Sequence, residues 1–305
     1  MFTSRLRRRL RRTRACRGSY NLAARALRRM RHVVDRDTVK VTTYLGHEFA
    51  YPADSMIGRH VARHGEWDAI LARIVVGAFP EDEPFICEVG SNIGASLLQI
   101  LHGKPQAKVL ALEPSDDFRP FLERNLTAAG YNDVRVLPLF VGAQPGTTYL
   151  YNNETTASAT GPEYADHEMR GRQEVDVKTL DQVLSAQHRV DFIKIDTDGF
   201  DFEVLKGAKR TLRNHQPLLF FELAPDLVSD SQARLRSLQA VGYERLICLS
   251  PGQNAAVLGV TDDPDRAVAW AEDSGYCDVL TWNSNEPKSA ARFANLEREL
   301  LAWPS

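Results

Sequence analysis

Long apolar runs alternate with stretches in which apolar residues recur at helical spacing, and this alternation fills the middle of the chain. Helical spacing follows the first two runs, over 93–101 and 118–126, and returns over 202–212. Because strands that are apolar along their whole length are buried on both faces, the pattern predicts an α/β fold with a Rossmann-like, mostly parallel open sheet and helices on both faces. The predicted strands are Phe85–Val89, Lys108–Glu113, Val134–Val141, Val190–Ile195 and Pro217–Phe221.

Two later runs, Tyr243–Leu249 and Tyr276–Trp282, flank a helical pattern over 264–272 and are expected to close the sheet, with an antiparallel closing strand. Ser115 is expected to cap the helix that follows the second strand. Changes in composition divide the chain. The expected units are an Arg-rich, poorly ordered N-terminal tail (1–35), an N-terminal extension that caps the substrate (36–81), a main domain (82–285) with a polar insertion over 142–180, and a C-terminal helical tail (286–305).

The first strand runs into an acid and then into two glycines, in the order Glu88, Gly90, Gly94. Glycines are needed where a chain turns sharply from a strand into a helix while its backbone closes on a ligand. Glu113 follows at the interval at which an acid after the second strand meets ribose hydroxyls. The pattern therefore predicts a nucleoside site. The alternatives are a tight turn without a ligand and, for Glu113, an acid at a helix start.

The residues around the glycines indicate which nucleoside is bound. Asn92 occupies the position at which a dinucleotide site needs Gly. The loop holds no Lys or Arg, and the nearby carboxylates would repel a polyphosphate and attract a cation. S-adenosylmethionine (SAM) suits this negatively charged surrounding. Its adenosine would lie at Glu113 and its sulfonium near the acids, and its carboxylate would bind the backbone amides at the start of the helix at Ile93. The acids expected along one rim of the pocket, at the carboxyl ends of strands, are Glu88, Glu113, Asp196 and Glu222.

Asp196 and Asp198 follow the fourth strand, where an acceptor would face the methyl group. A sulfonium is already a good leaving group, so the protein must mainly align the acceptor and remove its proton. Either carboxylate could be the base or could orient the hydroxyl, and the alternative for both is helix capping ahead of Phe202. Lys194 is a charge inside a buried strand, so a partner such as Glu222 or Glu88 is expected. We interpret Lys194 as a structural organiser first, with catalysis as the alternative.

Metal dependence is left open by the sequence. Asp196, Asp198 and Glu222 offer the oxygen ligands that Mg²⁺ prefers, but no spacing rule links them, so a required metal is not expected. The histidines are scattered, and His167, in the polar insertion, is the one singled out for a test. The tryptophans, Trp67 among them, are interpreted as core or interface aromatics.

Composition limits the remaining possibilities. No apolar segment is long enough for a membrane span or has the form of a signal peptide, so a cytoplasmic protein is expected. The four cysteines lack paired spacing and are expected to be reduced and mostly buried. The net charge of −2 hides an asymmetry, since residues 1–31 hold twelve of the 38 basic residues, all Arg, and no acid. This tail could contact a membrane surface or nucleic acid; the alternatives are a solvated terminus and an organelle presequence.

Three motifs resemble the FkbM family of SAM-dependent methyltransferases. They are Glu88-Val-Gly-Ser-Asn-Ile-Gly94, the Glu113-Pro114 pair and Asp191-Phe-Ile-Lys-Ile-Asp-Thr-Asp-Gly-Phe-Asp-Phe-Glu-Val-Leu-Lys-Gly-Ala208. The resemblance implies a class I methyltransferase fold and O-methylation of a sugar, glycolipid or natural product. The family more often has Asp at position 88, Val-Glu-Gly at 197–199 and Glu at 201. The cofactor-site residues that we expect are Glu88, Gly90, Ser91, Asn92, Gly94, Glu113, Pro114 and Val141.

Two other classes of protein stay open at this point. A nicotinamide-dependent oxidoreductase would share the sheet and Glu113, but Asn92 and the lack of a plausible hydride-site His speak against it. A catalytically inactive, methyltransferase-like binding protein is a further alternative, because one sequence does not show turnover. The acceptor, a small molecule or a glycan, and the oligomeric state are not legible in the sequence.

Overall fold

The computed structural model describes residues 38–152, 157–158, 171–251, 255–285 and 287–302. The Arg-rich tail, His167 and Cys16 lie outside these residues. Cys87, Cys248 and Cys277 are buried free thiols, as the sequence predicts. Within the described ranges, no helix has both the length and the apolar composition that crossing a membrane requires.

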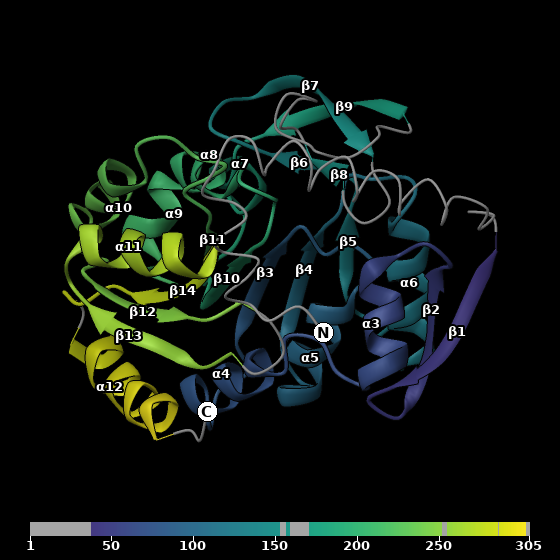
Figure 1. The fold of residues 1–305 in the computed structure, drawn as a ribbon, viewed down its shortest axis with the longest axis horizontal. Coiled ribbons are helices and arrows are strands. Elements are labelled where there is room, and N and C mark those ends of the chain that lie inside the picture. Colours follow the sequence, from purple (N-terminus) through teal and green to yellow (C-terminus); the bar gives the residue numbers. More distant parts are fainter. Residues whose placement is uncertain (1–37, 153–156, 159–170, 252–254, 286, 303–305) are drawn as a thin grey trace, which may run out of the picture.

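The centre of the fold is an eight-stranded sheet, which Figure 1 shows crossing the molecule. Its strands are β3 (Phe85–Val89), β4 (Lys108–Leu112), β5 (Arg135–Leu137), β10 (Phe192–Ile195), β11 (Leu218–Leu223), β12 (Arg245–Leu249), β13 (Val257–Thr261) and β14 (Cys277–Trp282). They are ordered β13-β12-β14-β11-β10-β3-β4-β5, with β5 to β11 parallel and β14 antiparallel to both neighbours. The predicted open sheet and its antiparallel closing strand are thereby confirmed. The order reverses between β3 and β10, which places a ligand site beyond their carboxyl ends.

Helices cover both faces of this sheet (Figure 1). One face packs against α3 (Met56–His64), α4 (Ile70–Ala78), α5 (Ala95–Gly103), α6 (Arg119–Ala128) and α12 (Pro287–Leu301). The other face packs against α7 (Leu180–Val183), α8 (Asp201–Lys206), α9 (Lys209–Asn214), α10 (Ser231–Gln239) and α11 (Pro264–Ser274). Strand alternation explains the division, since Ile86 belongs to the first core and Cys87 to the second. The continuous apolar runs in the sequence therefore correspond to strands that are buried on both faces.

Two smaller sheets flank the centre (Figure 1). β1 (Val39–Tyr44) and β2 (His47–Pro52) form a hairpin, which Asn125 of α6 fastens by exchanging two hydrogen bonds with the Ala50 backbone. β6 (Phe140–Val141), β7 (Gly146–Asn152), β8 (Ala157–Ser158) and β9 (Gly171–Lys178) form a four-stranded sheet. The polar insertion therefore contains strands that the sequence analysis did not predict. Its small core holds Leu150 and Val175, and a sheet with so few inward apolar residues leaves little apolar signal.

Three predicted boundaries are wrong in informative ways. The run Val134–Val141 is split between β5 and β6, which belong to different sheets, because Pro138 between them lacks the N–H that a ladder needs. The helix predicted over 202–212 is two helices that meet at Gly207. Ser115 does not cap α6, which begins at Arg119; its hydroxyl accepts a hydrogen bond from the Asp117 amide in the preceding turn.

Candidate active site

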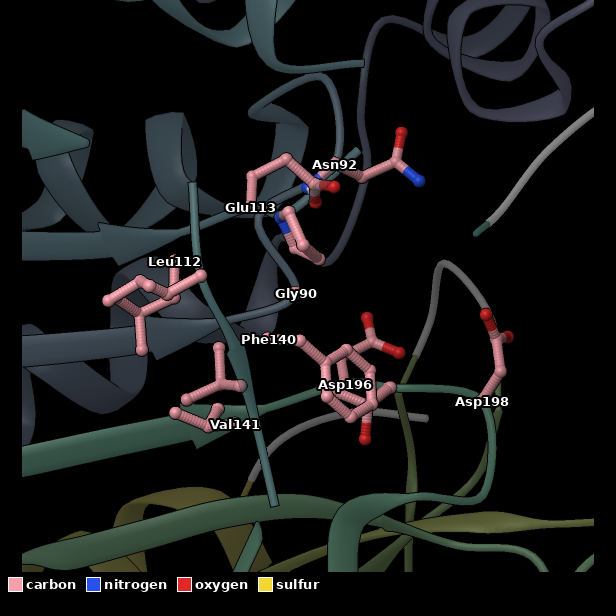
Figure 2. A pocket seen from close by; sticks show the side chains of 12 residues that line it. Gly90, Asn92, Leu112, Glu113, Phe140, Val141, Asp196 and Asp198 are labelled. Carbon is pink, nitrogen blue, oxygen red and sulfur yellow. Dashed lines mark hydrogen bonds between the residues drawn. The ribbon is translucent and has the colours of Figure 1, made fainter. Parts of the chain in front are cut away.

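Two adjoining cavities lie beyond the carboxyl ends of β3, β4 and β10. The first is lined by Val89, Gly90, Asn92, Leu112, Glu113, Pro114, Leu139, Phe140, Val141, Asp196, Thr197 and Asp198. The second, of about 200 Å³, is lined by Met56, Ile57, His60, Trp67, Asp68, Gly90, Ser91, Asn92, Ala95, Ser96, Asp196, Asp198, Phe220, Glu222, Tyr276 and Asp278. Figure 2 shows the first cavity, with Asn92 and Glu113 on one side and Asp196 and Asp198 on the other. Gly90, Asn92, Asp196 and Asp198 are common to both cavities.

The glycines of the loop are required by the protein's own packing. Gly90 has φ +81°, and a Cβ there would lie 2.0 Å from the Asp196 carbonyl oxygen. Gly94 has φ +88°, precedes α5 as its N-cap, and would place a Cβ 2.8 Å from Leu122 Cδ1. Gly94 lines neither cavity. The structure thus gives these glycines a cause in the convergence of β3 with β10 and of α5 with α6, and the expectation that they let the backbone close on a ligand stays a prediction.

Replacing Gly90 with Ala is expected to lower the free energy of unfolding by about 2–5 kcal/mol, because a left-handed conformation and a backbone clash are both imposed on a side chain. Gly130→Ala is the matched control, since Gly130 has φ +83° but nothing within 4 Å of its Cβ position. The control is expected to cost about 1 kcal/mol. Denaturant titration measures both values, and equal losses in the two variants would contradict the contact with Asp196.

Glu113 joins two loops and faces the first cavity. Its Oε2 accepts a hydrogen bond from the Asn92 amide at 2.7 Å and its Oε1 accepts one from the Ser115 amide at 2.8 Å. Burial raises the pKa of Glu113 to about 7, although the two amides oppose this shift. Since each carboxylate oxygen has two lone pairs, the group can still accept hydrogen bonds from a ligand. Glu113 therefore can bind the hydroxyls of a nucleoside in the first cavity.

Lys194 is a buried cation with three partners. Its Nζ lies 3.1 Å from Ser96 Oγ, 3.1 Å from Asp196 Oδ2 and 3.4 Å from Glu88 Oε1. Burial alone would lower the pKa of Lys194, but the carboxylates of Asp196 and Glu88 outweigh it and hold the pKa well above its ordinary value. The predicted partner Glu88 is confirmed. Because two hydrogen bonds and an ion pair with Glu88 hold the protonated ammonium group, Lys194 is suited to orient Asp196 and not to accept a proton.

Glu88 lies beneath the cavities and not along their rim. It is fully buried, its Oε1 accepts a hydrogen bond from Ser96 Oγ at 2.7 Å, and it lines neither cavity. Its Oε2 has no hydrogen-bond partner among the described residues. The expectation of a rim position for Glu88 is thus wrong, because the side chain points to the sheet face that holds Lys194. Glu113, Asp196 and Glu222 do line the cavities.

The loop after β10 presents Asp196 and Asp198 to both cavities. Asp196 is 45% exposed, and Asp198 adopts φ +51°. Asp201 is buried and fixes this loop, since its carboxylate accepts hydrogen bonds from the amide and hydroxyl of Thr197 and from the Glu222 amide. Burial raises the pKa of Asp201 to about 6. Phe200 is the N-cap residue of α8, and no side-chain hydrogen bond caps this helix.

Several cavity residues are absent from the sequence-based prediction. His60, Trp67 and Asp68 come from the N-terminal extension, and Tyr276 and Asp278 come from the last part of the sheet. One feature of the sequence could have identified Asp278, because it is an acid inside the largely apolar run of β14. No local pattern in the sequence marks Trp67 or Asp68, since only the packing of the N-terminal extension brings them to the sheet. In the described ranges, no three His, Cys, Asp or Glu side chains are placed to hold a metal ion.

Ser91, predicted from the sequence, is also at the second cavity. Its side chain is buried, and its hydroxyl has no hydrogen-bond partner within the described part of the chain. Val141 and Pro114 line the first cavity beside Glu113, and their contact with a nucleoside stays a prediction.

Curated proteins similar to this chain are methyltransferases. Methyltransferase sdnD of Sordaria araneosa is 32% identical over 156 residues, covering 41% of this chain and 60% of its own length. Methyltransferase 1 of Beauveria bassiana is 28% identical over 152 residues, covering 43% of this chain and 61% of its own length. The chain thus spans about three fifths of the length of each of these relatives.

Solved structures were compared as well. Methyltransferase FkbM from Methylobacillus flagellatus is 18% identical, with a TM-score of 0.42 over 66% of this chain and 43% of that one. An O-methyltransferase from Bacillus cereus in complex with SAH is 13% identical, with a TM-score of 0.39 over 74% of this chain and 86% of that one.

The family model of the methyltransferase FkbM domain matches residues 88–245, a range that begins at Glu88 and ends in β12. It contains the glycine loop, Glu113 and the segment from Lys194 to Asp201. Because this range is more than half of the chain, the protein belongs to the FkbM methyltransferase family.

Proposed function

We propose that this protein transfers the methyl group of SAM to a hydroxyl oxygen of a sugar, glycolipid or natural-product acceptor. The observation that carries the proposal is Asp196, which lines both cavities and is oriented by Lys194 at 3.1 Å. A carboxylate fixed between a nucleoside cavity and a second, larger cavity is placed to act on a group that meets the cofactor there. Family membership favours methyl transfer over the hydride transfer of an oxidoreductase.

The residues of the first cavity fit the nucleoside half of SAM. Leu139, Phe140 and Val141 offer apolar surface for a base, and Glu113 offers acceptors for ribose hydroxyls. Neither Lys nor Arg is among the lining residues, which suits a ligand without phosphates. The carboxylates of Asp196 and Asp198, at the junction of the cavities, suit a cationic ligand atom.

SAM supplies a methyl group on a sulfonium, which is a good leaving group, so the chain's own residues have to align the acceptor and take its proton. Asp196 accepts that proton as the acceptor oxygen gains the methyl group. Lys194 stays protonated and holds the Asp196 carboxylate in place. Glu88 and Ser96 hold Lys194 in turn.

Calorimetric titration of the full-length chain with SAM, SAH and NAD tests the cofactor, and SAH formation across a panel of hydroxyl compounds tests the reaction. We expect SAM and SAH to bind and NAD not to bind. Binding of NAD alone would contradict the proposal. Binding of SAM without turnover of any compound in a broad panel would favour the inactive binding protein instead.

The affinity for adenosine is expected to rise with pH. The pKa of Glu113 is raised to about 7, so its carboxyl keeps a proton well above the range in which an unfolded Glu loses one. Ribose hydroxyls bind best to the ionised form, and affinity should therefore increase about tenfold between about pH 6 and the plateau above about pH 8. Adenosine is the suitable probe because it does not titrate in this window.

The matched variant for this prediction is Glu113→Gln, which keeps the shape of the side chain but cannot ionise. It should bind adenosine more weakly than the wild-type protein at the upper end of the pH range and show no pH dependence. A flat profile in the wild-type protein would remove Glu113 from the nucleoside site. The same carboxyl lowers stability as pH rises from about 4.5 towards about 7, because the folded state binds its proton more tightly than the unfolded chain.

A further inference from the structure

The second cavity is strongly acidic. Five of its lining residues are Asp or Glu, and none is Lys or Arg. The buried cation Lys194, which contacts Asp196, is also engaged by Ser96 and Glu88. His60 adds no opposing charge at neutral pH, since burial lowers its pKa. The carboxylates come from four separate segments and are Asp68, Asp196, Asp198, Glu222 and Asp278.

Two of these acids oppose each other directly. Glu222 of β11 and Asp278 of β14 are cross-strand partners in the antiparallel register. Two ionised carboxylates in this relation would repel each other. Burial raises the pKa of Glu222 to about 10, and burial together with Asp68 and Asp196 raises that of Asp278 well above its ordinary value, so Glu222 keeps its proton at neutral pH in the protein alone. A positive charge placed between the two carboxyl groups would stabilise their ionised forms.

Two further observations point to a ligand in this cavity. The buried Ser91 hydroxyl lines it and has no hydrogen-bond partner in the described ranges. Trp67, Phe220 and Tyr276 form aromatic wall, and aromatic faces attract ammonium groups. SAM brings a net charge of only about +1, so the five acidic groups can accommodate a second positive charge when it is present.

We propose that the acceptor carries a protonated amine, which the second cavity binds at Glu222 and Asp278 while a hydroxyl of the same molecule faces Asp196. This inference rests on the proposed methyl transfer and narrows its substrate class to amino sugars and other amino alcohols. It also excludes acceptors that carry a carboxylate, sulfate or phosphate near the reacting hydroxyl, because no Lys or Arg lines the cavity to pair with such an anion.

The test compares glucosamine with glucose, N-acetylglucosamine and glucuronic acid as probes. The full-length protein is first saturated with SAH in the presence of EDTA, and each sugar is then titrated by calorimetry. Glucosamine should bind at least about tenfold more tightly than glucose or N-acetylglucosamine, and glucuronic acid most weakly. Equal binding of glucose and glucosamine would overturn the proposal, and so would displacement of glucosamine by equimolar Mg²⁺ in a parallel titration without EDTA.

Single substitutions test whether the preference for glucosamine arises at Glu222 and Asp278. Glu222→Gln and Asp278→Asn should each reduce the preference for glucosamine over glucose, whereas Asp133→Asn, at an exposed position away from the cavity, removes one negative charge and should not. Because each cavity variant puts a neutral amide of the same shape where burial disfavours a charged carboxylate, both should unfold at temperatures no lower than the wild-type protein, so loss of folding does not obscure the result. A preference that survives both cavity variants would contradict the site.

The two proposals fail separately. If SAH does not bind to the wild-type protein, the proposed methyl transfer is wrong. If SAH binds and the sugars are not distinguished by their charge, only the inference about the amine is wrong.

Discussion

The Asp196→Asn variant is expected to lose about 10²–10⁴-fold in kcat while its affinity for SAH changes little. Asn keeps the size of the side chain but cannot take the proton of the acceptor hydroxyl. The carboxylate lines both cavities and is 45% exposed, so it reaches the acceptor while Lys194 holds it. Initial rates of SAH formation, with an acceptor found in the panel, measure the loss, and calorimetry measures the SAH affinity.

Asp198→Asn is the control for this prediction, because Asp198 lines the same two cavities and lies two residues further along the loop. It is expected to lose less than about tenfold in kcat, as a group that shapes the site without taking the proton. A larger loss in Asp198→Asn than in Asp196→Asn would exchange the two roles. The sequence left this choice open, and the contact with Lys194 is the reason for preferring Asp196.

The second large effect is expected from Lys194→Met, which should lower the free energy of unfolding by about 3–5 kcal/mol. Met fills most of the volume, but the substitution leaves the carboxylate of Glu88 fully buried without its cation. Removing one partner of a buried ion pair costs more than the pair itself contributes, because the remaining charge has lost both water and partner. Denaturant titration at neutral pH measures the change.

A double variant separates charge from packing. Lys194→Met combined with Glu88→Gln removes both charges and should recover much of the stability lost by Lys194→Met alone. If the double variant is no more stable than the single one, the cost lies in packing and the ion pair is not the cause. Methyl transfer by the double variant should remain slower than in the wild-type protein, since Asp196 then lacks the ammonium group that orients it.

The sequence was sufficient for features that depend on local order. Continuous apolar runs gave β3, β4, β10 and β11 to within about two residues, because burial on both faces favours apolar residues at most positions. Lys194 was recognisable as a paired residue, since a lone charge in such a run is too costly. Glu113 and Asp196 were recognisable because each comes at or just after the end of an apolar strand, and parallel strands of one sheet end at the same edge.

Features that depend on which segments meet were decided by the tertiary structure. Gly90 was singled out as a ligand-binding glycine, and the tertiary structure adds a second requirement for glycine there, the Asp196 carbonyl oxygen, which is more than a hundred residues away in the chain. Glu88 was placed at the rim from its position at the strand end, and side-chain alternation puts it under Lys194 instead. The strands β7 and β9 pair with each other around few apolar residues, so no local pattern in the sequence predicts them.

The chain's own sequence therefore determined the central strands, the glycine loop and the carboxylates that follow the strands, because periodicity and turn chemistry act between near neighbours. Only the tertiary structure decided the second cavity. The register of β11 against β14 sets Glu222 opposite Asp278, and the packing of the N-terminal extension brings Trp67 and Asp68 to the same cavity. Strand register and the docking of an extension are fixed by contacts between distant segments, and single-sequence spacing does not contain them.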